Sequence, residues 1–267
     1  MTSDNAAVSD ASPSPAPSLR KEAGSFLFSV VIALVVALTF RSLFFEPFYI
    51  PSGSMKPTLL EGDYVFVSKY TYGYSRYSFP LGFPLFKGRV LGREPKRGEV
   101  VVFKHPKNPG VNYIKRLIGL PGDVIRVTGG RLFINGEAVR RDSIAPFGDT
   151  EKTEDGSKTR VSVPAYQETL PGGANFTTID ALKRGPLDNT GDYTVPPGHY
   201  FVMGDNRDNS VDSRVPEGVG FVPEENLLGP ARVVLFSSDA SFIKLYSWIA
   251  NFRTDRILRS LYAFPTE

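Results

Sequence analysis

The hydrophobic positions of the chain change their pattern near residue 46. Residues 23–45 form an apolar run, "AGSFLFSVVIALVVALTF", which "SLFF" continues beyond Arg41. A membrane-spanning helix needs about 20 mostly apolar residues, and a basic side chain near its end can reach the interface. The run therefore predicts a transmembrane helix. A cleaved signal peptide has a shorter core and a small-residue cleavage site, which "RSLFFEPF" lacks. A buried helix of a soluble domain is disfavoured, because the run is apolar on every face.

After residue 46 the pattern becomes typical of strands. "DYVFVSKY", "GEVVVFKHP" and "GPARVVLFS" are rich in β-branched and aromatic residues. "GRLFINGEAV" holds two short runs around Asn135-Gly136, a strong hairpin signal. With 25 glycines, 22 prolines and 12% aromatic residues, the composition suits a turn-rich β protein better than a helical bundle. The predicted fold is mostly β, with one transmembrane helix before an antiparallel β domain.

Composition shifts divide the chain further. The Ser/Ala/Pro-rich tail is predicted to be disordered, and the segment before the last strands is polar and rich in Gly, Pro and Thr. Near the C-terminus, apolar residues recur at helical spacing among basic ones, which predicts an amphipathic helix lying on a membrane or docked on its own domain. The aromatic loop Tyr72–Phe86 is either a lipid contact or a packed hairpin tip. The predicted segments are a tail (1–22), a transmembrane helix (23–45), and a domain (46–267) with core 46–130 and 196–236, an inserted β subdomain (136–195) and a C-terminal helix (241–263).

Counts of residue types exclude several classes of function. The chain has no cysteine, which excludes disulfides and cysteine-based metal sites or catalysis. Two histidines leave little material for a His-rich metal centre, so no metal site is expected. The net charge is +3 with no long basic run, so no nucleic-acid partner is expected.

The candidate chemistry begins in "FYIPSGSMKPTL", which holds Ser52 and Ser54. A serine needs a base to become a nucleophile. Both histidines lie in Pro/Gly-rich turns, and no G-x-S-x-G elbow is present. A lysine can serve if burial lowers its pKa from about 10.4 to about 7. Lys115 lies in the apolar strand "VNYIKRLIGL", although a solvated strand lysine is the local alternative.

Three segments together resemble a known family. "PSGSMKPTL", "NYIKRLIGLPGD" and "GDNRDNSVDSR" are similar to signature boxes of the type I signal peptidase (leader peptidase) family, in that family's order and behind an N-terminal anchor. The resemblance covers most of 44–130 and 196–236, and departs from the family only in extra residues at 215–218. It implies a Ser-Lys serine protease with an antiparallel β fold and no cofactor.

The resemblance also implies roles for individual residues. Ser54 is the expected nucleophile and Lys115 its unprotonated general base. Ser52 is expected to join the Ser54 backbone N–H in the oxyanion hole. Residues expected to support the lysine are Ser210, the ion pair Asp212–Arg214 and a further pair, Asp205–Arg116. The apolar positions expected to line shallow substrate pockets are Ile50, Pro51, Met55, Leu59, Tyr113 and Ile114.

These roles predict a signal peptidase I that cleaves exported preproteins with small residues at positions −1 and −3. Its expected location is the plasma (inner) membrane in a single pass, contacting lipid, with the N-terminus in the cytoplasm and the catalytic domain on the outer (periplasmic) side. One alternative is a dedicated peptidase of the same clan, for example in a conjugation system. Another is a non-catalytic, membrane-tethered β binding domain.

Overall fold

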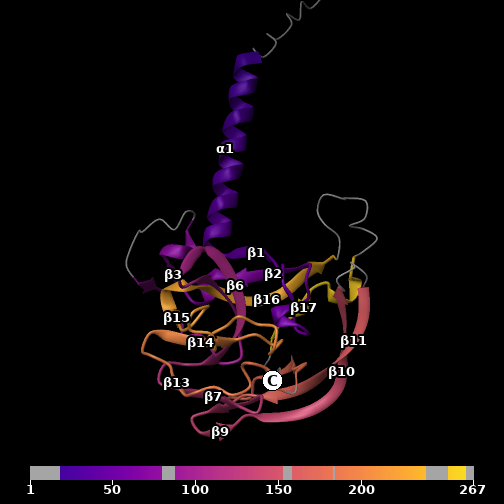
Figure 1. The fold of residues 1–267 in the computed structure, drawn as a ribbon. Coiled ribbons are helices and arrows are strands. Elements are labelled where there is room, and N and C mark those ends of the chain that lie inside the picture. The colour runs from indigo at the N-terminus through magenta and orange to yellow at the C-terminus, as the bar shows by residue number, and fades with distance from the viewer. Residues whose placement is uncertain (1–18, 80–87, 153–157, 183, 239–251, 263–267) are drawn as a thin grey trace, which may run out of the picture. The chain divides into compact units, whose positions relative to one another are not determined.

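The structure is a computed structural model and describes residues 19–79, 88–152, 158–182, 184–238 and 252–262 (Figure 1). Its contacts divide the chain into a first unit, 1–40, and a second unit, 41–267. The described part of the first unit lies in helix α1 (Leu19–Leu43). Among the described helices, α1 is the one long and apolar enough to cross a membrane, over Ala23–Leu43. The helix ends at Leu43 rather than at the predicted Phe45, because strand β1 begins at Phe45.

The second unit is built around an eight-stranded antiparallel sheet. The strand order is β1-β2-β16-β5-β6-β14-β15, with β17 also paired to β16 (Figure 1). The strands are β1 (Phe45–Tyr49), β2 (Asp63–Ser68), β5 (Val100–His105), β6 (Asn108–Gly119), β14 (His199–Met203), β15 (Val222–Pro223), β16 (Leu227–Ser237) and β17 (Arg259–Ser260). The mostly β, antiparallel fold predicted from the sequence is confirmed.

Strand β5 shows how this sheet is packed. Its residues Val100 and Val102 join a core cluster with Ile50 and Met55, whereas Val101 joins a second cluster with other apolar side chains. Successive side chains of a strand point to opposite faces, so both faces of the sheet are covered here. That is why β5 reads as a continuous apolar run.

Smaller sheets complete the described β structure. One has the order β13-β7-β8-β9, another β10-β11-β12, and a third pairs β3 with β4. The strands are β3 (Tyr74–Ser75), β4 (Arg89–Val90), β7 (Val124–Thr128), β8 (Arg131–Ile134), β9 (Glu137–Ala138), β10 (Arg140–Lys152), β11 (Lys158–Thr169), β12 (Asn175–Ile179) and β13 (Tyr193–Thr194). Short 3-10 turns are η1 (Gly53–Met55), η2 (Lys69–Thr71), η3 (Arg76–Ser78), η5 (Glu224–Asn226) and η6 (Thr254–Arg256).

The polar segment 136–195 is more regular than the sequence indicated. β10 and β11 form a long antiparallel hairpin, with a register shift between Ile144 and Phe147. Many of its side chains are exposed, so the strands lack the apolar alternation by which strands are recognised. The Asn135-Gly136 hairpin is present between β8 and β9, with φ of 54° and 83° at these residues.

The predicted C-terminal helix is wrong over residues 252–262. These residues form η6 and the edge strand β17, and the rest of the predicted helix, 241–251, lies outside the described residues. The basic residue Arg256 is buried in an ion pair with Asp63, and Leu261 joins the core. Tertiary contacts therefore override the local helical spacing. Of the aromatic loop, Tyr72 is buried and bonded to Glu99, and residues 80–87 lie outside the described residues.

Candidate active site

The turn that carries Ser54 is fixed through its backbone. Ser54 lies in η1, in the connection between β1 and β2. From the segment after β14, the Asn206 N–H donates to the Ser54 carbonyl at 3.1 Å, and Asn206 Nδ2 donates to the Gly53 carbonyl at 3.1 Å. The first and third boxes therefore meet directly, although about 150 residues separate them along the chain.

Lys115 faces the hydroxyl of Ser54. It lies in β6 opposite Val101, and its Nζ is 2.5 Å from Ser54 Oγ. The lysine is 4% exposed, and the ring centre of Tyr113 lies 5.6 Å from Nζ. Neither His105 nor His199 bonds to Ser54 among the described residues; both rings bond to backbone groups of their own turns.

The surroundings of Lys115 change its proton affinity. Burial lowers the pKa of Lys115 from 10.5 to about 8; the nearby carboxylates of Asp212 and Asp205 oppose this, and Arg214 reinforces it. With a pKa of about 8, roughly one lysine in ten is neutral at pH 7, against fewer than one in a thousand for an exposed lysine. The site can therefore supply a neutral amine next to a serine hydroxyl, the pairing that nucleophilic catalysis needs.

The predicted ion pair Asp212–Arg214 is present beside this dyad. Both side chains are buried, and Arg214 Nε and Nη2 each lie 2.9 Å from a carboxylate oxygen of Asp212. Burial alone raises the pKa of Asp212, but the Arg214 cation and the N–H of Gly204 outweigh it, so that this pKa is below its ordinary value. The carboxylate stays charged and balances the arginine.

Gly204 packs where no side chain fits. A Cβ at this position would lie 2.3 Å from Ser210 Oγ and 2.6 Å from the Ser54 carbonyl oxygen. The side chain of Ser210 therefore lies close to the turn that carries Ser54. Its Oγ is buried and does not bond to Lys115, so the predicted bond is not formed in this structure; it lies beside the Asp212 carboxylate and helps to keep the pKa of Asp212 low.

The pair Arg116–Asp205 is also present. Arg116 Nε and Nη2 lie 2.7 and 2.5 Å from the two carboxylate oxygens, and each side chain is 1% exposed. The Thr58 hydroxyl donates to Asp205 at 2.6 Å, and Arg116 also donates to the Gly98 carbonyl. This network joins the loop after Ser54, strand β6 and the third box. It therefore fixes the positions of Ser54 and Lys115 relative to each other.

The remaining predicted site residues divide by exposure. Ser52 is exposed and makes no hydrogen bond with the described residues, which leaves its hydroxyl accessible to a ligand. Of the six predicted pocket residues, Pro51, Tyr113 and Ile114 keep some accessible surface. The other three are almost fully buried in the core and serve as walls behind the surface: Ile50, Met55 and Leu59.

Sequence reasoning missed an ion pair close to Ser54. Lys56 Nζ lies 2.7 and 3.0 Å from the carboxylate oxygens of Asp149, which belongs to the β10–β11 hairpin. Both side chains are largely buried, with exposed fractions of 15% and 14%. Nothing in the local sequence pairs residues so far apart. Gly204 and Asn206 were also missed as positioning residues, although both lie in the third box.

Among the described residues, one group of three aspartates has the spacing of a metal site. Oxygens of Asp180, Asp188 and Asp208 lie within 4.8 Å of one another. Arg141 already pairs with Asp180 at 2.6 Å and compensates part of that negative charge. We therefore assign no ion to this group.

Comparison with known proteins identifies the family. The family model described as "Signal peptidase, peptidase S26" matches residues 23–236, which include all three boxes. The chain belongs to the S26 signal peptidase family. Proteins named signal peptidase I from Rickettsia typhi and Rickettsia prowazekii are 42% and 41% identical to it, each over 91% of this chain and 94% of the relative.

A solved structure is also similar in sequence. A crystal structure of a signal peptidase I from Enterococcus faecalis is 30% identical, covering 52% of this chain and 97% of that chain, with a TM-score of 0.30. So low a TM-score carries no weight for the fold. For this S26 family member, the relatives and helix α1 together point to membrane anchoring.

Proposed function

We propose that this protein is a membrane-anchored serine endopeptidase that removes N-terminal signal peptides from exported preproteins with a Ser-Lys dyad. Family membership supports the reaction. One observation carries the assignment of residues: Lys115 Nζ lies 2.5 Å from Ser54 Oγ, in surroundings that bury the lysine and lower its pKa. Ser54 is the nucleophile and Lys115 the general base.

The reaction begins with proton transfer from Ser54 to Lys115. Neutral Nζ accepts the Oγ proton as Oγ attacks the carbonyl carbon of the scissile bond. The resulting ammonium then donates a proton to the leaving amine, and the signal peptide stays bound to Ser54 as an ester. In the second step Lys115 takes a proton from water as the water oxygen attacks the ester carbonyl carbon. The ester bond then breaks, the signal peptide leaves, and the Lys115 ammonium returns the proton to Ser54 Oγ, which regenerates the serine and the neutral lysine.

The negative charge on the carbonyl oxygen needs donors that are already in place. The Ser54 N–H and the exposed hydroxyl of Ser52 are the proposed donors. The buried hydroxyl of Ser210 can accept a hydrogen bond from the Lys115 ammonium once Ser54 is acylated. Asp212 and Arg214 form an ion pair that keeps this segment in place, and the Arg214 cation offsets part of the attraction that the Asp212 carboxylate exerts on a charged lysine.

Substrate selection follows from the apolar residues around the dyad. Pro51, Tyr113 and Ile114 offer surface, and buried bulky side chains stand behind them. Shallow sites of this kind accept small side chains, which supports cleavage after small residues at positions −1 and −3.

The proposed location is the plasma (inner) membrane. Helix α1 supplies one membrane span, and exported preproteins emerge on the outer face. The N-terminus therefore lies in the cytoplasm and the domain after residue 45 on the outer (periplasmic) side, next to lipid.

The proposal is tested with the full-length chain in detergent micelles and a preprotein whose cleavage site reads Ala-x-Ala. Ser54→Ala and Lys115→Ala should each lower the cleavage rate by at least about 10³-fold while the circular dichroism spectrum is unchanged. Lys107→Ala, at a half-exposed surface lysine, is the matched control and should keep full activity. Normal cleavage by either dyad variant would refute the mechanism.

A further inference from the structure

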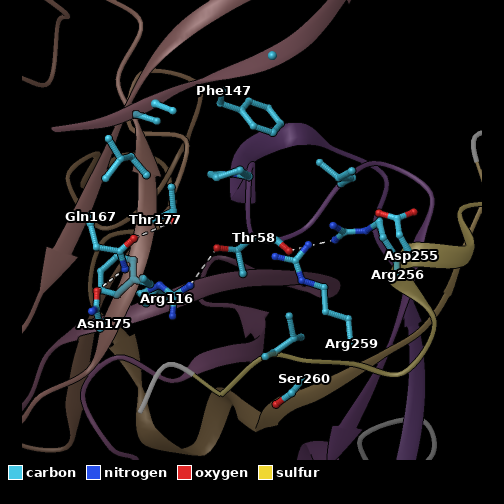
Figure 2. A pocket seen from close by; sticks show the side chains of 18 of the residues that line it. Thr58, Arg116, Phe147, Gln167, Asn175, Thr177, Asp255, Arg256, Arg259 and Ser260 are labelled. Carbon is cyan, nitrogen blue, oxygen red and sulfur yellow. Dashed lines mark hydrogen bonds between the residues drawn. The ribbon is translucent and has the colours of Figure 1, made fainter. Parts of the chain in front are cut away.

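A cleft of about 620 Å³ is lined in part by the loop that follows Ser54 (Figure 2). Pro57 and Thr58 are the residues that this loop contributes first. One wall is the β10–β11 hairpin with strand β12, and the other is the segment 255–262. Figure 2 shows Thr58 in the middle, with Gln167, Asn175 and Thr177 to one side. A cavity of this volume is in the usual range of ligand sites.

The cleft lies within a short peptide's reach of the dyad. Pro57 is three residues after Ser54, so even a fully extended chain would place it at most about 11 Å away. The loop is turned rather than extended, because the Lys56 N–H bonds to the Gly53 carbonyl. The ion pair between Lys56 and Asp149 ties this loop to the hairpin wall next to the cleft. A substrate segment of three extended residues spans about 10 Å.

Both walls offer apolar surface. Ile144 and Phe147 belong to the hairpin, and Ile144 is 38% exposed. Across the cleft, Tyr262 is 60% exposed. A polypeptide lying between them would cover side chains that are exposed on both sides at once.

The charges of the cleft are mostly balanced, with one exception. Arg116 and Arg256 belong to the lining, but each is buried and paired with an aspartate behind the wall. Arg259 is exposed and has no ion pair among the described residues. Asp255, the one acidic side chain of the described lining, is exposed as well. An acidic ligand residue is therefore favoured where it lies next to Arg259 rather than next to Asp255.

We infer that this cleft binds the first residues of the mature protein, those that follow the scissile bond, as an extended segment with an apolar or acidic side chain. This inference rests on the proposed function. It makes the inserted hairpin and the C-terminal segment parts of the substrate site. It also gives Arg259 a role in specificity, far along the chain from the dyad.

The length of the mature segment is the first test. Two fluorescent peptides share the sequence up to the scissile bond and end either one or seven residues beyond it. Binding is measured with the full-length Ser54→Ala variant, and cleavage with the unaltered protein. The longer peptide should bind about tenfold more tightly to Ser54→Ala, since one buried apolar side chain alone contributes at least that factor. In the unaltered protein the difference should appear in KM more than in kcat.

Charge is the second test, with Glu or Lys placed four residues after the scissile bond of the longer peptide. The unaltered chain should prefer Glu by about two- to fivefold, the range of a partly exposed ion pair. Arg259→Glu should reverse that preference and keep its thermal unfolding midpoint. Arg131→Glu, at an exposed position of β8 outside the cleft, is the matched control and should leave the preference unchanged.

Each failure points to a different error. Equal binding of the short and long peptides to Ser54→Ala would overturn the inference while cleavage by the unaltered protein left the proposed function standing. Unchanged Glu preference in Arg259→Glu would overturn the role of Arg259. If the unaltered protein cleaved neither peptide nor a preprotein, the proposed function itself would fail.

Discussion

Lys115 carries its charge in most molecules at pH 7, although the protein buries it. Burial lowers its pKa from 10.5 to about 8, so the folded protein holds an ammonium in a place that disfavours it. Replacing Lys115 with methionine removes this charge and keeps a long unbranched side chain. The variant should therefore be more stable than the unaltered protein and inactive as a peptidase.

The magnitude follows from the difference between the two pKa values. At pH 7 the lysine is protonated in both the folded and the unfolded chain, and a shift from 10.5 to about 8 costs the folded state about 3 kcal/mol. Methionine forfeits the hydrogen bond to Ser54, worth about 1 kcal/mol. The free energy of unfolding of Lys115→Met should thus exceed that of the unaltered protein by about 2 kcal/mol.

The pH dependence of this difference has a definite sign. Between pH 8 and 10.5 the unfolded chain binds a proton at Lys115 that the folded chain has released, so the unaltered protein gains stability as the pH rises. The variant lacks this gain. The difference in unfolding free energy should therefore shrink by about 2 kcal/mol between pH 7 and pH 9.5.

The assay is urea unfolding of the full-length protein in detergent micelles, followed by circular dichroism of the β domain at both pH values. Lys107→Met, at a half-exposed lysine, is the control and should change the unfolding free energy by less than about 0.5 kcal/mol. A Lys115→Met variant that is less stable than the unaltered protein at pH 7 would refute the account of a buried, strained charge. A difference independent of pH would refute it equally.

Three further predictions concern the same site. The cleavage rate should rise about tenfold from pH 6 to pH 7 and level off above pH 8, as the base becomes neutral; a rate that falls over this range, in a pH titration of kcat, would contradict the assignment. Gly204→Ala should lower kcat by about 10²-fold, because its Cβ would displace Ser54 or Ser210 by a distance of the order of 1 Å, and kinetics on a folded variant will check this. Asp205→Asn should lower the unfolding free energy by about 3–5 kcal/mol, because Arg116 is left buried without its partner; a loss below 1 kcal/mol in urea unfolding would show that the pair is not structurally needed.

The sequence by itself determined the class of fold and, through the three boxes, the family. Residue periodicity is a local property, so the apolar run of α1 and the strand-forming segments could be read directly. The three boxes occur together and in the family's order, and this indicated Ser54 and Lys115 as the candidate residues. The local sequence around Lys115 did not separate a buried base from an ordinary exposed lysine.

Tertiary structure decided what depends on contacts between distant segments. The pKa of Lys115 falls because strands from other parts of the chain exclude water from it. The pair of Lys56 with Asp149 joins residues 93 positions apart. The C-terminal segment has helical spacing, yet Arg256 pairs with Asp63 and β17 pairs with β16, so it forms a strand edge instead. Each outcome depends on burial and on contacts with distant residues, which a local sequence pattern does not contain. The sequence could therefore indicate Ser54 and Lys115 as candidates, and only the fold shows how the two side chains are held.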